Sequence, residues 1–228
     1  MDRREFTGRV VVGAGLWIWA AQARALSLSD ADASAGLKEA LQRGAEVAVG
    51  LLGKTDGFLG NPKVRIPLPS ALDSAAKLMR GLGQGAPVDE LVTAMNRAAE
   101  SAVPEAKPLL IDAVHSMTVT DARKILTGGQ TSVTQFFAGK TRKPLGIRFL
   151  PIVTAHTEKL ALAQKYNAVA GQASGFGLVK QEDANVQQYV TGKALDGLYY
   201  MIGEEERRIR KDPVGTGSTL LKKVFGSL

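Results

Sequence analysis

Apolar residues recur at intervals of three and four along most of the chain, and this spacing restricts the possible folds more than any other feature. In the first such segment, residues 34–52, the repeated positions are Leu37, Leu41, Ala45, Ala48 and Leu52. Similar segments begin near Ser70, Pro87, Thr118, Thr131, Pro144, Val186 and Ser218. This interval places the apolar residues on one face of a helix. The sequence therefore predicts an all-α fold, a single-domain irregular bundle of about seven to nine helices.

One stretch, residues 54–69, interrupts the helical spacing. It contains the turn-forming pair Asp56-Gly57 and ends in Pro67-Leu68-Pro69, and its prolines are incompatible with a regular helix. Residues 64–66 alternate as in a short strand, but the sequence offers no second strand to pair with them. We therefore expect an ordered, proline-rich extended segment laid over the helices.

Short polar motifs predict where two of the helices begin. Ser70 with Asp73, and Thr118 with Asp121, have the three-residue spacing of a capping box. In that motif the two side chains reciprocally bond the exposed backbone N–H groups of a helix start. We therefore expect a cap at each of these positions.

The second half of the chain is expected to hold three further helical segments before residue 212. A short helix is predicted over residues 131–138, and a long one over residues 144–170 is expected to bend at Pro151. A helix from residue 186 ends in residues 204–210, Glu-Glu-Glu-Arg-Arg-Ile-Arg, whose opposite charges lie four residues apart. Such pairs contribute only about 0.3 to 0.5 kcal/mol each, so a solvated helical face is the simplest interpretation.

The first 25 residues are typical of an export signal. Arg3 and Arg4 precede an apolar run over residues 10–21, and Ala23-Arg24-Ala25 places small residues where a signal peptidase cuts. As a helix the run spans only about 18 Å, too short for a membrane anchor. The paired arginines favour the twin-arginine route, with a general secretory signal as the alternative. We expect cleavage after Ala25, a periplasmic location, and a helical domain over residues 26–228 without a transmembrane segment.

The chain contains no cysteine. Disulfides, thiolate metal ligands, thiol nucleophiles and a lipoprotein anchor are therefore excluded for this sequence. Its formal charge is +7, and removal of residues 1–25 takes away four arginines and two carboxylates, which leaves +5. A modestly basic surface favours anionic partners such as phospholipid headgroups. Export makes nucleic acid an unlikely partner.

Several short segments are shared with one exported bacterial family. They are Asp56-Gly57-Phe58 with Asn61, Ile66-Pro67-Leu68-Pro69, residues 95–100 (Met-Asn-Arg-Ala-Ala-Glu), Met117-Thr118 with Asp121-Ala122 and Ile125-Leu126, residues 193–200 (Lys-Ala-Leu-Asp-Gly-Leu-Tyr-Tyr) and residues 210–213. On these residues the chain resembles domain of unknown function family 4197 over nearly all of residues 26–228. The resemblance implies a helical, exported protein and no established activity. Members often carry lipoprotein signals, so the missing cysteine implies that this chain is released rather than lipid-tethered.

No combination of residues predicts a catalytic or metal centre. Of the two histidines, His115 and His156, only His115 has a carboxylate near the spacing of a helical metal pair, Asp112 three residues earlier. A metal site usually needs three or four ligands. The Gly-x-Ser-x-Gly elbow of serine hydrolases is also missing. We therefore expect no metal, no cofactor and no catalytic residue, and favour a non-enzymatic protein.

Six residues are candidate contacts for a bound ligand. They are Phe58, Asn61, Arg65, Asn96, Glu100 and Asp121. Asn96 and Glu100 lie one turn apart beside the apolar stripe of their helix, and the favoured interpretation is that they bond the backbone of the proline-rich stretch. The alternative is a metal-independent hydrolase in which Glu100, Asp112 or Asp121 acts as an acid or base.

A third candidate surface is basic. Lys140, Arg142 and Lys143 follow Phe136-Phe137, and Lys222-Lys223 fall in the predicted helix over residues 218–225. Each basic residue near an anionic membrane contributes about 1 kcal/mol to binding. Adjacent aromatic residues on a helix point about 100° apart, so one or both phenylalanines are expected in the core.

Together these features favour an exported, non-enzymatic binding or cell-envelope-associated protein, whose ligand is apolar or anionic and lipid-like. Two alternatives stay open at this point. One is the metal-independent hydrolase, and the other is an assembly or interaction protein.

Overall fold

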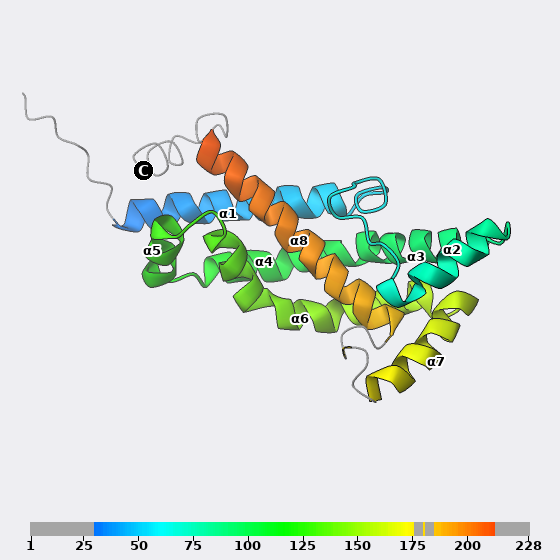
Figure 1. Ribbon diagram of the computed structural model, residues 1–228. Helices are drawn as coiled ribbons and strands as arrows, with labels where there is room; N and C mark the ends of the chain where they lie inside the picture. The colour runs from blue at the N-terminus through cyan, green and yellow to red at the C-terminus, as the bar shows by residue number, and fades with distance from the viewer. Residues whose placement is uncertain (1–29, 176–179, 181–184, 213–228) are drawn as a thin grey trace, which may run out of the picture.

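The computed structural model describes residues 30–175, 180 and 185–212. Its α-helices are α1 (Asp30–Leu52), α2 (Asp73–Gly81), α3 (Ala86–Ala102), α4 (Ala106–His115), α5 (Val119–Thr127), α6 (Ser132–Thr157), α7 (Ala161–Gly175) and α8 (Val186–Lys211) (Figure 1). Two short 3-10 helices, η1 (Ser70–Leu72) and η2 (Val103–Glu105), precede α2 and α4. These residues contain no strand, so the predicted all-α class is confirmed. The expected export signal of residues 1–25 and the helix carrying Lys222 and Lys223 lie outside the described residues.

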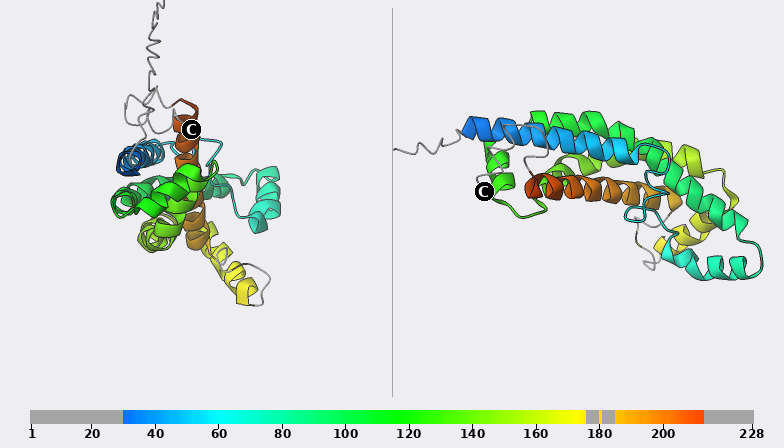
Figure 2. Two further views of the ribbon diagram at one scale, coloured as in Figure 1. Left: turned by 90° about the vertical axis from the view of Figure 1, so that its left-hand side faces the viewer. Right: turned by 90° about the horizontal axis from the view of Figure 1, so that it is seen from above.

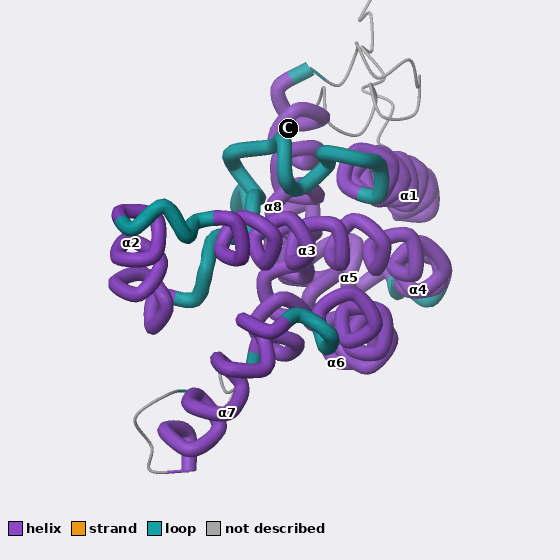
Figure 3. Tube along the Cα trace, turned by 90° about the vertical axis from the view of Figure 1, so that its right-hand side faces the viewer, coloured by secondary structure: helices purple, strands orange, loops and turns teal. Residues whose placement is uncertain are grey.

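The long helices form an elongated bundle (Figure 2). α6 packs most extensively against α8 and α3, while α1 packs against α8 and α4. Short α5 lies at one end of the bundle, whereas α2 and α7 project from the other end (Figures 1 and 3). Within the described part of the chain, no helix is both long and apolar enough to cross a membrane.

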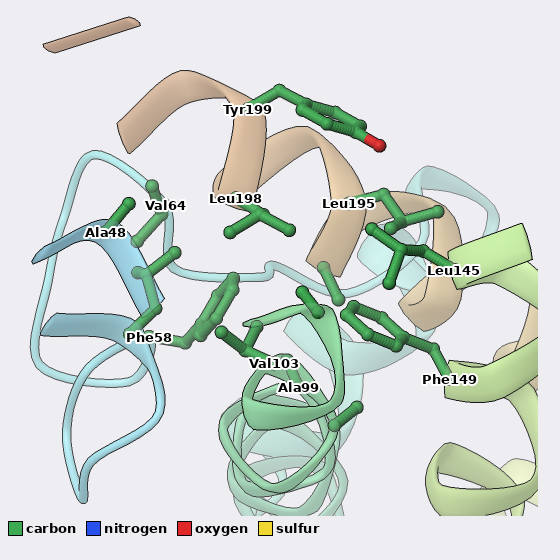
Figure 4. Packing of buried hydrophobic residues seen from close by; sticks show 14 of the residues in the cluster. Ala48, Phe58, Val64, Ala99, Val103, Leu145, Phe149, Leu195, Leu198 and Tyr199 are labelled. Carbon is green, nitrogen blue, oxygen red and sulfur yellow. The ribbon is translucent and has the colours of Figure 1, made fainter. Parts of the chain in front are cut away.

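A continuous apolar core runs between the long helices. Its largest fully buried side chains include Phe58, Phe137, Phe149, Leu145 and Leu198. Figure 4 shows Phe58 from the segment after α1 and Leu198 from α8 pointing toward the same interior space. Because the chain has no disulfide, its stability depends on such burial, at about 25 cal/mol per Å² of apolar surface.

The helix α6 corrects the prediction of two helices over residues 131–138 and 144–170. It is continuous through Pro144 and Pro151, and the break falls instead between α6 and α7. Each proline lacks the N–H that would bond the carbonyl four residues back, here those of Lys140 and Ile147. Both of these residues lie on the exposed side of α6, where solvent can hydrogen-bond their carbonyls. The cost of each proline is therefore low enough for the helix to continue.

One of the two predicted capping boxes is present. Thr118 Oγ1 accepts a hydrogen bond from the backbone N–H of Asp121 (3.1 Å), and Asp121 Oδ2 accepts one from the N–H of Thr118 (3.1 Å). The box predicted for Ser70 and Asp73 is wrong, because the chain enters α2 through η1 and neither helix has a side-chain cap. The prolines before Ser70 favour this tight 3-10 entry over an ordinary cap.

The C-terminal end of α8 corrects the prediction of a solvated face. Glu205 and Glu206 are only 7% and 5% exposed, because α8 packs against α1 and α6. Glu206 Oε1 accepts a hydrogen bond from Arg210 Nη2 (2.9 Å), and this guanidinium also donates to the carbonyl of Ile125 in α5 (3.1 Å). The charged run therefore ties α8 to the end of the bundle.

Candidate ligand-binding groove

Residues 53–69, here called the strap, join α1 to η1 and lie against both α3 and α8 (Figure 1). The strap has the irregular backbone that its prolines predict. Its inward side chains Phe58, Val64 and Ile66 are buried, while Lys63 and Arg65 are exposed. An irregular segment with a buried side needs partners for its backbone groups, since unpaired buried amides are costly.

Asn96 of α3 supplies partners for the middle of the strap. This side chain is fully buried. Its Oδ1 accepts a hydrogen bond from the N–H of Ile66 (2.9 Å), and its Nδ2 donates to the carbonyl of Ile66 (2.9 Å) and to that of Val92 (2.8 Å). Both backbone groups of Ile66 are thereby paired, as a neighbouring strand would pair them.

Glu100, one turn further along α3, holds the start of the strap. Its Oε1 accepts hydrogen bonds from the N–H groups of Phe58 (3.0 Å) and Leu59 (3.1 Å). Its Oε2 accepts one from Arg97 Nη1 (2.6 Å), and Arg97 Nη2 donates to Asp56 Oδ1 (2.9 Å). The bonds to Glu100 and Asp56 raise the pKa of Arg97. The predicted bonding of Asn96 and Glu100 to the proline-rich stretch is therefore confirmed.

The outer side of the strap and α8 enclose a groove of about 290 Å³. Its lining residues are Lys63, Val64, Arg65, Ile66 and Pro67 from the strap, and Lys193, Asp196, Gly197 and Tyr200 from α8. Gly197 allows the close approach of the two elements, since a Cβ there would lie 2.6 Å from Phe58 Cε1 and 3.3 Å from Val64 Cβ. Figure 4 shows Phe58 and Val64 beside the turn of α8 that carries Leu198.

Some of the charged side chains around this groove form ion pairs and others do not. Asp196 Oδ1 lies 2.7 Å from Arg142 Nη2, and Lys63 Nζ lies 3.0 Å from Glu204 Oε2. The Arg65 side chain has no hydrogen-bond or ion-pair partner among the described residues, and the Lys193 ammonium has only the ring of Tyr189, whose centre is 5.7 Å from Nζ. Two cations without a carboxylate partner therefore line the same groove.

The ion pair between Lys63 and Glu204, at the edge of the groove, shifts the pKa of both groups. Hydrogen bonds from Arg207 and then Lys63 lower the pKa of Glu204 to about 2. The same carboxylate raises the pKa of Lys63. Lys63 is therefore charged but already paired with Glu204. Arg65 and Lys193 are the cations that are left to bind a ligand.

A second groove, of about 480 Å³, lies between α5 and α6 and includes Asp121, Lys124 and Lys140. Hydrogen bonds from the backbone and side chain of Thr118 lower the pKa of Asp121, and the charges of Lys140 and Lys124 add to this effect. The two lysines of this groove thus face a carboxylate. Although larger, this groove is closer to charge balance than the one beside the strap.

The other candidate residues do not lie together in one site. Phe58 is fully buried beneath the groove and belongs to the core. Asn61 Oδ1 accepts a hydrogen bond from the N–H of Lys63 (3.1 Å) and so shapes the turn of the strap. Asp112 is exposed on α4. Asp121 lines its groove without Glu100 or Asp112, and both oxygens of Glu100 are occupied by the strap and Arg97.

The predicted basic cluster is also divided. Arg142 pairs with Asp196 and lies 5.9 Å from the ring centre of Tyr199, whereas Lys143 is exposed. Phe137 is fully buried and meets Phe136 edge to face, with ring centres 5.5 Å apart, as the core interpretation predicts.

Sequence reasoning did not select Lys63, Lys193 or Tyr200. A signal for the last two exists, because Lys193, Asp196, Gly197 and Tyr200 follow one another at intervals of three, one and three. This spacing places all four on one face of a helix. No group of three or more histidines and carboxylates among the described residues is arranged to hold a metal ion.

A family model described as "Protein of unknown function (DUF4197)" matches residues 27–226. No curated protein and no solved structure matches the chain.

Proposed function

The chain belongs to the family of proteins of unknown function DUF4197, and we propose that it is a binding protein whose ligand is an amphiphilic anion held between the strap and α8. The observation that carries this proposal is the pair of cations, Arg65 and Lys193, that line one groove without a carboxylate partner among the described residues. A charged group left unpaired on a rigid surface is available to a ligand of opposite charge.

The chemistry of the groove favours a phosphate or carboxylate group. A guanidinium offers two parallel N–H donors that match the oxygens of either group, and an ammonium adds a second positive charge. Tyr200 and Pro67 offer apolar surface beside these cations. A volume near 300 Å³ is at the lower end for small-molecule sites, so the groove suits a headgroup or a small metabolite rather than a whole acyl chain.

The anchoring of the strap supports this proposal. Asn96 and Glu100 fix the backbone on both sides of Arg65. A ligand that binds Arg65 therefore does not have to order the strap, and the entropic cost of binding is correspondingly small.

Native mass spectrometry of the protein purified from its source cells tests this function. We expect a bound mass that is retained by the Lys124→Gln/Lys140→Gln control, which alters the other groove, and lost in Arg65→Gln/Lys193→Gln. Release of that mass by organic solvent would identify a lipid, and release only by aqueous denaturation would identify a soluble anion. A bare chain, or equal loss in both variants, would contradict the proposal.

We further propose, from residues 1–25 alone, that the protein is exported by the twin-arginine route and acts in the periplasm. Fractionation of cells that express the full chain tests this proposal. The wild type should be recovered in the periplasm with Leu26 as its first residue, while Arg3→Lys/Arg4→Lys should stay uncleaved in the cytoplasm. Export of both forms at the same rate would favour the general secretory route.

A further inference from the structure

The helix α6 carries two opposite rows of residues, each with a spacing of four. The inner row is buried and consists of Phe137, Thr141, Leu145, Phe149, Val153 and Thr157. The outer row is exposed throughout and consists of Gly139, Lys143, Ile147, Pro151 and Ala155. Residues four apart share one face of a helix. α6 therefore turns one side to the core and the opposite side outward, along the edge of the bundle where Figure 1 shows it.

The outer row combines an apolar centre with flanking positive charge. Ile147 is 70% exposed, more than any other large hydrophobic side chain of the described residues, and Leu150 beside it is also exposed. Lys143 lies one turn before Ile147, and Arg148 follows it. Neither of these two cations forms an ion pair with another described residue.

The charge of α6 has a single sign. Its 26 residues include Lys140, Arg142, Lys143 and Arg148 but neither aspartate nor glutamate. Arg142 is directed to Asp196 of α8, so it is not available to the outer row. The first carboxylate after α6, Glu158, lies just past its C-terminal end.

We infer that the outer row of α6 docks on an anionic phospholipid surface, with Ile147 and Leu150 entering the headgroup region and Lys143 and Arg148 contacting lipid phosphates. Exposed apolar residues flanked by lysine and arginine are the pattern of interfacial helices. A second copy of the chain fits this face poorly, because symmetric pairing would bring the same unpaired cations together. This inference is independent of the groove beside the strap, since it uses none of its lining residues.

The absence of cysteine allows a position-specific test. Ile147→Cys in the full chain provides the sole thiol, to which an environment-sensitive fluorophore can be attached. Leu78→Cys on α2 is the matched control, since Leu78 is 64% exposed and also neighbours a lysine. With vesicles of equal parts phosphatidylglycerol and phosphatidylcholine, we expect the fluorophore at position 147 to shift to the blue and become shielded from an aqueous quencher. The fluorophore at position 78 should stay unchanged.

Two further arms complete the test. Lys143→Gln/Arg148→Gln in the Ile147→Cys chain should require about thirty-fold more anionic lipid for half of the shift, because each basic residue contributes about fivefold to binding. Pure phosphatidylcholine vesicles should give no shift. An unchanged fluorophore at position 147, equal shielding at position 78, or shielding at position 147 before lipid is added would overturn the inference. The test compares the fluorophore at two positions of the same chain. Membrane binding by the apolar residues 10–21 would occur in both labelled proteins, so it would not produce a shift confined to position 147.

Discussion

The two sides of the strap differ in how their polar groups are paired. On the α3 side, Asn96 and Glu100 are buried, and their side chains bond three backbone N–H groups and a carbonyl of the strap. On the α8 side, Arg65 and Lys193 line a groove without a carboxylate partner among the described residues. The polar groups on the two sides of the strap therefore have different roles. Paired buried groups fix the position of the strap, and the unpaired charges that it presents are available for binding.

The largest effect is expected from Asn96→Ala. It removes three hydrogen bonds and leaves the N–H and carbonyl of buried Ile66 unpaired, which should lower the free energy of unfolding by about 3 to 4 kcal/mol. Asn61→Ala is the control on the strap itself and should cost less than about 1 kcal/mol. Urea denaturation measures both values. Equal costs would show that the α3 side is not the anchor.

The next effect is expected from Gly197→Ala. The new Cβ would lie 2.6 Å from Phe58 Cε1, and because Phe58 is fully buried, the overpacking should cost about 1 to 3 kcal/mol. Gly192→Ala is a matched control on the same helix, since nothing lies within 4 Å of its added Cβ. That control should be neutral or stabilise by up to about 1 kcal/mol. A similar stability change in both variants would contradict the close approach of the strap to α8.

The double variant Arg65→Gln/Lys193→Gln should leave stability nearly unchanged. Both side chains are exposed, so the free energy of unfolding should change by no more than about 0.5 kcal/mol. Binding of the proposed anion should weaken at least about tenfold, because a charge-assisted hydrogen bond contributes about 1.5 to 3 kcal/mol. Thermal unfolding with and without the ligand measures both properties. A large loss of stability would mean that this side of the strap is structural as well.

The smallest effect concerns pH. The pKa of Glu204 is lowered from 4.5 to about 2 in the folded protein, so its charged form favours folding. This contribution is present in full above about pH 4.5 and is lost as the pH falls toward 2. Glu204→Gln should therefore flatten the fall in stability over this window, as acid titration followed by circular dichroism would show. Superimposable acid profiles for the two proteins would argue against the ion pairs of Glu204 with Arg207 and Lys63.

Much of the fold could be predicted from local patterns. The apolar spacing of α1, α3 and α8 predicts these helices because each buries one continuous stripe. The prolines of residues 62–69 likewise predict the irregular strap. By contrast, Ser70-Asp73 and Thr118-Asp121 have the same spacing, yet only the second forms a capping box. The difference comes from the chain that precedes Ser70, which a short motif does not include.

The candidate site was less accessible to sequence reasoning. Asn96 and Glu100 stand out because polar residues beside an apolar stripe need partners, and the strap is a segment that needs them too. The pairing of Arg142 with Asp196, and the presence of Lys193 and Arg65 in one groove, depend on how α6, α8 and the strap pack together. Burial of Glu206 also depends on packing, since the charged run of residues 204–210 by itself favours solvent.

The central claim is that the α8 side of the strap binds an anion, and titration of the isotope-labelled protein with glycerol 3-phosphate tests it most directly. This probe carries the phosphate shared by lipid headgroups and soluble metabolites. The account predicts saturable NMR shifts of the backbone amides of Arg65, Ile66, Lys193 and Gly197, absent in Arg65→Gln/Lys193→Gln. Shifts centred on Lys124 and Lys140, or none at saturating probe, would contradict it.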